Sequence, residues 1–470
     1  MAYVGEPLGQ HAQRRPNAPA LTLEAETLTW AELERRVSGM AQALSFYPSG
    51  SRLALAIYNP VQFLISYFAI VRAGHVVTVF DPDWPEERRQ KIEAAIQPVA
   101  VLIEPTSSGT GSSPYHPPSE HDPFYIGFTS GSTGLPKGFE RTHSSWLESF
   151  RVSETEFGIS SSDHVLIAGS MQHSLHLYGA VHALHTGASV TLFSRFDPKI
   201  ISGCLQSESI SVLYATPTQL HYIYETLKRQ EASVPLRLGL ASGAKWRPED
   251  QTRLQQVFPN ATLAEFYGAS ETSFLTASNG VKTSLDNSVG FPVQGVELCI
   301  GDPLHPLPVG QSGLIWTRSP MVFSRYVCGD SPDTRWKGEW LTVGDHGFLD
   351  KTGALFLTGR ENRMIISSGL NIYPEEVERV LESQDGVAAA AVFGVDDPVR
   401  GECLVAIIRP KGEALKAEQL AKACRSNLGR GFVPREFHFE EKWPLTNGGK
   451  TDLAKLKTRY LAGQTQRAGK

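Results

Sequence analysis

The chain has 470 residues, which is longer than a domain with one ordinary core, so two or three globular domains are expected. Its hydrophobic content of 41% is enough to form their cores. The formal net charge of -5 and the lack of a Lys/Arg run argue against a general basic surface, so no nucleic-acid partner is expected. Its five cysteines are scattered without a C-x-x-C pair and indicate neither a zinc site nor a disulfide framework.

The start of the chain and its apolar runs do not predict a membrane protein. Met1–Glu6 lacks the basic-then-apolar pattern of a secretory leader, and the most apolar stretch, Val61–Val71, is too short to span a bilayer. We therefore expect a cytoplasmic protein with no membrane span. The oligomeric state is open, with a homodimer among the alternatives.

A loop rich in glycine and hydroxyl residues occupies residues 128–138. Residues 106–119 are of low complexity and predict a flexible connector. Asp122–Gly127 predicts a strand, the segment "FTSGSTGLPKG" (Phe128–Gly138) comes next, and a helix is predicted from Glu140 onward. The segment is therefore expected to join a strand to a helix.

The composition of this loop suits a polyphosphate. Glycines let backbone N–H groups face an anion, hydroxyls add donors, and Lys137 adds a compact positive charge. It is not a Walker A loop, which would need glycine where Pro136 stands. An ordinary surface turn is the alternative that the composition leaves open. The loop residues concerned are Thr129, Ser130, Gly131, Ser132, Thr133 and Gly134.

Strand-like and helix-like segments alternate through the middle of the chain, which predicts an α/β fold. The predicted strands are Val165–Ala168, Ser189–Phe193, Ile210–Ala215, Leu236–Leu240 and Ala261–Phe266. The predicted helices between them include Thr218–Arg229 and Arg247–Phe258.

Four histidines in one short segment, His173, His176, His182 and His185, suggest a metal site at first sight. Their apolar neighbours indicate an amphipathic helix instead, and no cysteine or acid completes a ligand set. We therefore expect no metal at these histidines.

The pattern changes after residue 360, where Val387–Val392 and Cys403–Ile408 predict strands and Lys416–Leu428 predicts a helix. This favours a small α+β domain. The expected division is residues 1–360 for a large domain of mixed sheets packed with helices, and residues 361–470 for a small mobile domain.

Several segments together resemble the adenylate-forming superfamily of acyl-CoA synthetases, peptide-synthetase adenylation domains and luciferases. The loop "FTSGSTGLPKG" is similar to the signature of that family, and further motifs follow in the expected order over essentially the whole chain. They are "LTWAELERRVSGMAQAL", "YNPVQFLISYFAIVRAGHVVTVFDPDWP", "ASGAKW", "YGASET", "TVGDHG", "GRENRMIISSGLNIYPEEVE" and "PLTNGGK". The resemblance implies a mixed-sheet adenylation domain followed by a mobile carboxy-terminal domain.

The resemblance implies an ATP site. The glycine loop with Lys137 would hold the phosphates, and Glu271 would bind Mg²⁺, which prefers hard oxygen ligands shared with substrate phosphates. Asp345 would take the ribose hydroxyls. The remaining residues that the resemblance places at the nucleotide or acyl group are Gly243, Ala244, Tyr267 (stacked on adenine), Gly268, Ser270 and Arg360.

The resemblance also implies a two-step mechanism. Lys450 in "PLTNGGK" would be the catalytic lysine, whose cation reduces repulsion when an acyl carboxylate attacks the α-phosphorus of ATP. The Gly369 segment would then line the pantetheine tunnel. Asn362 falls at the expected hinge, where the family more often has Asp or Lys.

Two features limit the range of carboxylic acids that are expected as substrates. The segment "SMQHSLHLYG" offers His173, matched to the mouth of the acyl pocket, and no acid, so a free amino acid would lack a partner for its ammonium group. The small residues Gly239, Ala241, Gly243 and Ala244, in segments that the resemblance places at the acyl pocket, would leave room for a chain. A medium or long fatty acid is the favoured substrate, and an aryl acid is the second.

The sequence therefore predicts an AMP-forming acyl-CoA synthetase that uses ATP, Mg²⁺, coenzyme A and a small carboxylic acid. The alternatives are an acyl-AMP ligase that loads a carrier-protein phosphopantetheine, an aryl-CoA ligase, and a non-catalytic acyl-adenylate sensor. The presence of Lys450 argues against the sensor, since binding alone needs no lysine for the attacking step.

Overall fold

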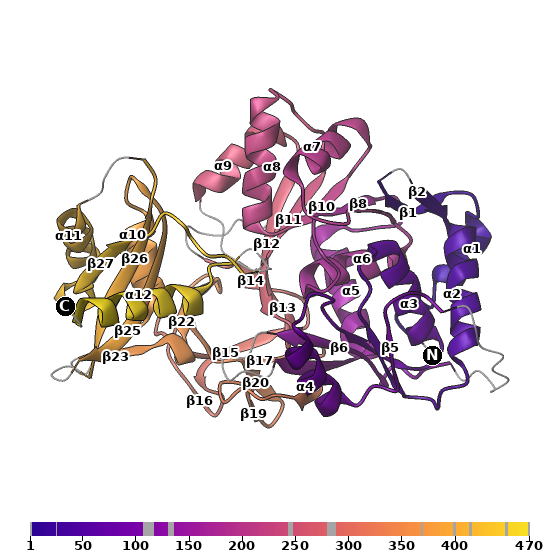
Figure 1. Ribbon diagram of the computed structural model, residues 1–470, viewed down its shortest axis with the longest axis horizontal. Coiled ribbons are helices and arrows are strands. Elements are labelled where there is room, and N and C mark those ends of the chain that lie inside the picture. The colour runs from indigo at the N-terminus through magenta and orange to yellow at the C-terminus, as the bar shows by residue number, and fades with distance from the viewer. Residues whose placement is uncertain are drawn as a thin grey trace. The chain divides into compact units, whose positions relative to one another are not determined.

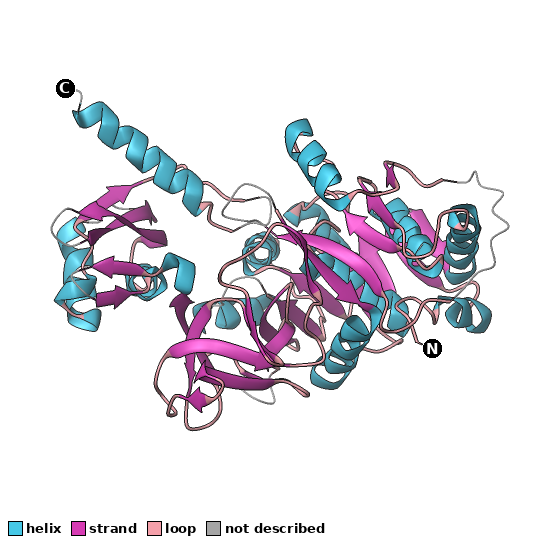
Figure 2. Cartoon of the chain, turned by 90° about the horizontal axis from the view of Figure 1, so that it is seen from below, coloured by secondary structure: helices cyan, strands magenta, loops and turns pink. Residues whose placement is uncertain are grey.

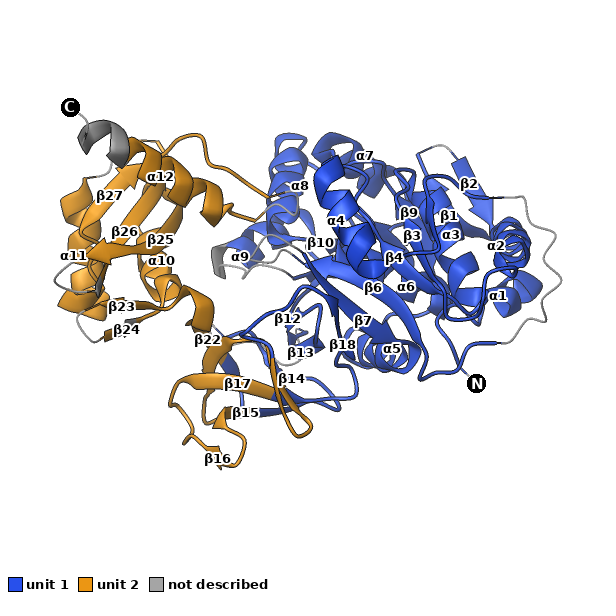
Figure 3. Ribbon diagram, turned by 60° about the horizontal axis from the view of Figure 1, so that its bottom comes forward, with its two compact units in different colours: residues 1–298, 317–334, 353–355 blue, residues 299–316, 335–352, 356–470 orange. Residues whose placement is uncertain are grey.

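The computed structural model describes residues 2–24, 26–106, 117–129, 136–242, 248–279, 288–367, 370–397, 401–412, 416–446 and 450–468. They form two compact units (Figure 3). Unit 1 comprises Met1–Leu298, Thr317–Thr334 and Gly353–Leu355, and unit 2 comprises Cys299–Trp316, Arg335–Thr352 and Phe356–Lys470. The expected fold class is confirmed, with a large unit of mixed sheets and helices and a smaller carboxy-terminal part. The boundary after residue 360 concerns a hinge and stays a prediction.

Unit 1 contains a nine-stranded sheet in the order β14-β13-β12-β11-β10-β8-β9-β1-β2 (Figure 1). The six strands from β12 to β1 run parallel, and the strands at both edges run antiparallel to their neighbours. All five strands predicted between residues 165 and 266 are confirmed in this sheet. Its strands are β1 (Pro19–Leu23), β2 (Glu26–Thr29), β8 (His164–Ile167), β9 (Ser189–Leu192), β10 (Val212–Ala215), β11 (Leu238–Ala241), β12 (Thr262–Ala269), β13 (Ser273–Ser278) and β14 (Phe291–Pro292).

The helices that accompany this sheet begin where the sequence supplies capping residues. Thr216 caps α8 in a capping box with Gln219, and Pro217 occupies the first turn, where a missing N–H costs nothing. The two helices predicted between the strands, α8 and α9, are confirmed. The helices are α5 (His143–Phe157), α6 (Ser174–Thr186), α7 (Pro198–Ser207), α8 (Pro217–Arg229) and α9 (Pro248–Val257).

Helix α6 carries three of the four clustered histidines, and its expected amphipathic character is wrong. Every residue from His176 to Leu184 is buried, so the helix lacks a solvent face in that span. Histidine is tolerated there because it is neutral: burial lowers the pKa of His176 to about 3. The helix itself is confirmed.

A six-stranded sheet in the order β18-β7-β6-β4-β3-β5 completes the framework of unit 1. Strands β3 to β6 run parallel, while β7 is antiparallel to both β6 and β18. Its strands are β3 (Arg52–Leu55), β4 (Val76–Val79), β5 (Ala100–Leu102), β6 (Pro123–Thr129), β7 (Lys137–Thr142) and β18 (Arg325–Cys328). The helices of this part are α1 (Leu8–Arg14), α2 (Trp30–Leu44), α3 (Pro60–Arg72) and α4 (Glu86–Ile96).

The element after the glycine loop corrects one prediction. Residues 137–142 form strand β7 rather than the start of a helix, because Glu140 and Arg141 pair with Ile126 and Tyr125 of β6. Helix α5 begins only at His143, where Thr142 accepts the Ser145 N–H as its cap. The glycine loop therefore joins two antiparallel strands, not a strand and a helix.

Unit 2 contains most of a seven-stranded sheet and a five-stranded sheet with two helices on a shared core. The first has β15 (Glu297–Asp302), β16 (His305–Pro306), β17 (Gly313–Arg318), β19 (Arg335–Lys337), β20 (Trp340–Thr342), β21 (Asp345–Leu349) and β22 (Leu355–Arg360). The second has β23 (Ile365–Ser367), β24 (Leu370–Ile372), β25 (Val387–Asp397), β26 (Gly401–Pro410) and β27 (Glu436–Phe439). The helical elements are η1 (Glu361–Arg363), α10 (Pro374–Glu382), α11 (Ala417–Leu428), η2 (Arg430–Phe432) and α12 (Leu453–Ala468). Figure 2 distinguishes the helices, strands and loops of the chain by colour.

The carboxy-terminal core of unit 2 confirms the predicted strands and helix. Val377 and Leu381 of α10 and Leu420 of α11 pack in one buried cluster with Val392 and Leu404 of the β25–β26 pair.

Among the helices in the described ranges of both units, none is long and apolar enough to cross a membrane.

Candidate active site

The two ends of the glycine loop lie opposite each other. Thr129 ends β6 and is the register partner of Lys137, which begins β7, so antiparallel pairing holds the hydroxyl and the ammonium group at the same end of the hairpin. The Thr129 hydroxyl is buried and finds no hydrogen-bond partner among the described residues. Ser130, Gly131, Ser132, Thr133 and Gly134 lie outside the described residues, so their phosphate-binding role stays a prediction.

Glu271 lies on a tight turn between β12 and β13. The Thr272 N–H donates to the Ala269 carbonyl at 3.0 Å, and the Ala269 N–H donates to the Thr272 hydroxyl at 2.9 Å. At Gly268 a side chain is sterically excluded, since a Cβ there would lie 1.7 Å from the Ser273 carbonyl oxygen. Tyr267 and Ser270 flank this turn and are half-buried. The "YGASET" segment is thus a rigid hairpin end that presents one carboxylate.

A buried arginine holds this turn in place. The Arg141 guanidinium donates to the Ser270 carbonyl at 2.8 Å, the Ser273 hydroxyl at 2.7 Å and the Met321 carbonyl at 2.5 Å. Burial lowers its pKa to about 10, which leaves it charged at neutral pH. Arg141 therefore fastens the Glu271 turn to β7, the strand that begins with Lys137.

Tyr326 of β18 connects the two predicted phosphate-site residues. Its hydroxyl donates to Glu271 Oε1 at 2.6 Å, and the Lys137 ammonium lies 5.6 Å from the centroid of its ring. The Glu271 side chain belongs to a residue that is only 5% exposed, and a buried carboxylate needs such a donor. Lys137, Tyr326 and Glu271 form what we call the phosphate cluster of unit 1.

His173 lies immediately before α6 and is half-buried. The next residue, Ser174, has its hydroxyl 3.0 Å from the Ser270 hydroxyl, so the start of α6 lies beside the Glu271 turn. His176, one turn further, is fully buried and its Nε2 lies 3.2 Å from Gln219 Oε1. The predicted position of His173 near the site is consistent with this packing, and its role at an acyl pocket stays a prediction.

Asp345 and Arg360 meet in unit 2. Asp345 begins β21 and Arg360 ends β22, and Arg360 Nε lies 2.7 Å from Asp345 Oδ1. Lys450 is an exposed residue, and its carbonyl accepts the Thr446 N–H at 2.7 Å. Although the residue as a whole is exposed, nearby protein groups displace part of the water around its ammonium and lower its pKa; the Arg360 guanidinium also lowers this pKa, whereas the Asp345 carboxylate raises it. These three residues form what we call the basic cluster of unit 2.

The remaining predicted residues are Gly243, Ala244 and Gly369, and all three lie outside the described residues. Sequence reasoning missed Tyr326 and Arg141. Neither stands in a segment with a recognisable pattern of its own, and their importance is visible only through contacts with residues far away in the chain. No motif that the sequence analysis identified contains Tyr326. Arg141 falls in a segment predicted to be a helix, where an arginine is expected to be solvent-exposed.

The residues of the phosphate cluster fit a magnesium ion that is bound mainly by substrate oxygens. Mg²⁺ takes one or two protein carboxylates and fills its other positions with water and phosphate, and Glu271 supplies one such carboxylate. Within the described ranges, no group of three His, Cys, Asp or Glu residues forms a protein-only metal cage.

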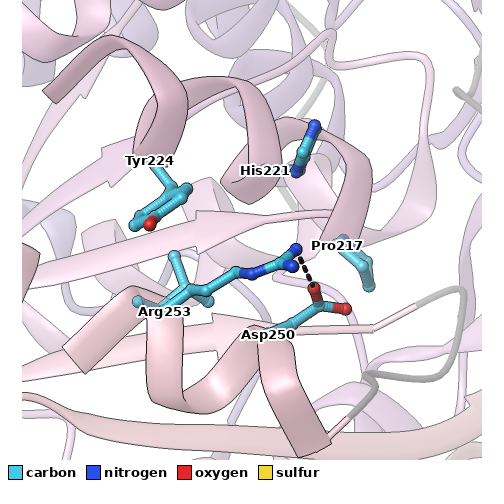
Figure 4. A pocket seen from close by; sticks show the side chains of 6 residues that line it. Pro217, His221, Tyr224, Asp250 and Arg253 are labelled. Atoms are coloured by element: carbon cyan, nitrogen blue, oxygen red, sulfur yellow. Dashed lines mark ion pairs between the residues drawn. The ribbon is translucent and has the colours of Figure 1, made fainter. Parts of the chain in front are cut away.

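A pocket elsewhere in unit 1 contains none of these residues (Figure 4). It lies between α8 and α9, and its Asp250 and Arg253 side chains form an ion pair at 3.8 Å. The other residues that line it are Pro217, His221, Tyr224 and Leu254.

Comparison with known proteins gives consistent results over most of the chain. The profile of the AMP-binding enzyme family matches residues 8–112 and 104–327, and that of the AMP-binding enzyme C-terminal domain matches residues 376–450. The "uncharacterized acyl-CoA ligase YhfT" of Bacillus subtilis is 37% identical, with 95% of this chain and 96% of that protein covered. The "putative long chain fatty acid-CoA ligase VraA" of Staphylococcus epidermidis is 29% identical, with 99% and 100% covered.

Among solved structures, the amide bond synthetase McbA of Marinactinospora thermotolerans superposes with a TM-score of 0.85. It is 25% identical, and the match covers 97% of this chain and 100% of that one.

Proposed function

This chain belongs to the AMP-binding enzyme family, and from that premise we propose that it is an acyl-CoA synthetase that works through an acyl-adenylate. In the first step a carboxylate oxygen attacks the α-phosphorus of ATP, and the bond to the β-phosphate oxygen breaks, which gives acyl-AMP and pyrophosphate. In the second step the CoA thiol attacks the acyl carbonyl, loses its proton and releases AMP.

The phosphate cluster is the observation that carries this proposal. It holds a cation at the mouth of a glycine loop and a carboxylate on a rigid turn, joined through one tyrosine. Lys137 would bind the outer phosphates, and Glu271 would hold Mg²⁺, which would neutralise phosphate charge when bound. A cation for phosphate and a carboxylate for Mg²⁺, side by side, favour Mg·ATP over an uncharged ligand.

The basic cluster would serve the same reaction. Lys450 and Arg360 bring two positive charges near one carboxylate, Asp345. We assign Asp345 to the ribose hydroxyls, Arg360 to the nucleotide and Lys450 to the charge that develops as the carboxylate attacks the α-phosphorus. Tyr267 remains assigned to adenine, and Gly369 to the passage of the CoA arm.

The proposal has two further parts, the identity of the carboxylic acid and that of the molecule that accepts the acyl group. The name of VraA supports a long fatty acid, which is also the first choice from the sequence, with an aryl acid second. The name of McbA raises an amine as acceptor in place of CoA, beside the carrier-protein alternative. A cytoplasmic location and a homodimer stay predictions.

Pyrophosphate release tests the function. The purified protein would be given Mg·ATP and a panel of fatty, aryl and short acids, each with no acceptor, CoA, a phosphopantetheine carrier protein or an amine. We expect slow release with the right acid alone and multiple turnovers only with CoA. Turnover with the carrier protein or the amine alone would replace the CoA assignment, and nucleotide binding without release under any condition would favour the sensor.

A further inference from the structure

The hydroxyl of Tyr326 lies between two oxygen atoms. It donates its one proton to Glu271 Oε1 at 2.6 Å, so at Thr334 Oγ1, 3.1 Å away, it accepts. The short distance to the carboxylate is typical of a charge-assisted hydrogen bond.

The ring of Tyr326 is held from several sides. Tyr326 pairs with Phe139 across β18 and β7, which ties it to the strand that begins with Lys137. Its ring meets Phe323 edge-on with 4.9 Å between centroids, and the Lys137 ammonium lies over its face. A hydroxyl on so constrained a ring has little freedom to follow a carboxylate that rotates.

The backbone of Glu271 is fixed independently. Its carbonyl accepts the Phe323 N–H at 2.7 Å, and the preceding carbonyl, of Ser270, accepts the Arg141 guanidinium. With the backbone fixed, the carboxylate can move only by rotation about the side-chain torsions of Glu271. The hydrogen bond from Tyr326 restricts this rotation. A carboxylate offers about four lone-pair sites, so one bond at Oε1 leaves others open to a metal.

We infer that Tyr326 is a positioning residue that holds the Glu271 carboxylate in the orientation that binds Mg²⁺ between the enzyme and the ATP phosphates. The inference rests on the proposed function, in which Glu271 is the metal-binding residue. It adds a residue whose own atoms contact neither metal nor substrate in this role. Preorganisation of a ligand by a neighbouring hydrogen bond is how outer-shell residues tune metal affinity.

A purely structural role makes a different prediction. If Tyr326 only satisfied a buried carboxylate, its loss would lower stability and leave metal affinity unchanged. Tyr326→Phe removes the hydroxyl and keeps the ring over which Lys137 lies. The matched control is Tyr224→Phe, which removes a hydroxyl bound to Gln256 Oε1 at 3.1 Å, outside the phosphate cluster.

The test measures Mn²⁺, as a spectroscopic substitute for Mg²⁺, by electron paramagnetic resonance with a non-hydrolysable ATP analogue bound to the full-length protein. We expect Tyr326→Phe to weaken Mn²⁺ binding about tenfold, as for the loss of one hydrogen bond to a charged group. Tyr224→Phe should bind Mn²⁺ as the wild type does. Urea titration of each variant checks that all are folded under the conditions of the measurement.

Glu271→Gln separates the inference from the function on which it rests. Weaker Mn²⁺ binding in both Glu271→Gln and Tyr326→Phe supports the inference. Weaker binding in Glu271→Gln with wild-type binding in Tyr326→Phe overturns the role of Tyr326 and leaves the magnesium site intact. Wild-type Mn²⁺ binding in Glu271→Gln overturns both the magnesium assignment and the inference.

Discussion

Arg360 Nε lies 2.7 Å from Asp345 Oδ1, and the two residues occupy the end of one strand and the start of another. The pair is asymmetric, since the Asp345 side chain is 5% exposed whereas that of Arg360 is 56% exposed. A buried carboxylate needs a partner, and the exposed side of the guanidinium is accessible to a nucleotide phosphate. The arrangement suits an aspartate that is held ready for ribose hydroxyls.

Asp345→Asn should weaken nucleotide binding. The amide keeps the shape of the side chain but loses the charge that accepts two hydroxyl protons strongly, a loss of about 1.5–3 kcal/mol for hydrogen bonds to a charged group. We therefore expect the Kd for AMP to rise roughly 10- to 100-fold. Calorimetric titration with AMP measures this. The same Kd in variant and wild type would remove Asp345 from the nucleotide site.

Lys450→Ala should damage the two half-reactions unequally. We expect acyl-AMP formation to fall roughly 10²- to 10³-fold, as when one preorganised donor is deleted, while CoA attack on supplied acyl-AMP is spared. Single-turnover assays of each step measure the difference. Lys455→Ala, an exposed lysine on α12, is the control and should leave both steps unchanged. Equal loss in both steps for Lys450→Ala would contradict the assignment.

Arg141→Lys should destabilise unit 1. Arg141 bonds to carbonyls of two separate segments, and an ammonium group cannot reach the same acceptors because it lacks the planar guanidinium fork. Unsatisfied buried acceptors cost about 1–3 kcal/mol each, so we expect a loss of roughly 3 kcal/mol in the free energy of unfolding. Urea denaturation measures it. Arg325→Lys, at a mostly exposed arginine paired with Glu140, is the control and should cost less than about 1 kcal/mol.

Unit 1 should lose stability in mild acid. Burial lowers the pKa of His143, His176 and His185 to about 3 in the folded protein, far below the unfolded value of 6.5. Between these values the unfolded chain binds more protons, so stability falls as the pH drops below about 6.5 and continues to fall toward pH 3. Each histidine contributes up to about 1.4 kcal/mol per pH unit.

His143→Asn tests this origin of the acid sensitivity. His143 Nδ1 accepts the Val4 N–H at 3.2 Å, and the Asn carbonyl can accept the same proton without titrating. The urea midpoint of this variant should depend less steeply on pH between 6.5 and 4 than that of the wild type. An unchanged slope would show that His143 does not account for the loss.

The strands and helices of the central α/β region were predictable because their apolar residues recur with the period of each element. Strand β7 was not, because "KGFERT" (Lys137–Thr142) carries charged residues whose burial depends on partners in β6 and β18. The same limit applies to α6, where a polar histidine suggests a solvent face that tertiary packing removes.

Some residues of the candidate site could be predicted from the sequence and others could not. Motifs indicated Glu271, Asp345 and Lys450, because charged residue types within those motifs suggest metal, hydroxyl or phosphate binding. Tyr326 lies 55 positions from Glu271, and no local pattern connects them. The pairing of Asp345 with Arg360 likewise follows from the meeting of two strand ends, which only the fold determines.

Transfer of ¹⁸O from the acid to AMP tests the central claim most directly. A carboxylic acid that supports turnover would be supplied with both carboxylate oxygens labelled, together with unlabelled Mg·ATP and CoA. Mass spectrometry would then measure the number of ¹⁸O atoms in each product. Attack by the carboxylate on the α-phosphorus predicts one ¹⁸O atom in each AMP, one in each acyl-CoA and none in pyrophosphate. Label in pyrophosphate or phosphate, or formation of ADP in place of AMP, would contradict an acyl-adenylate mechanism.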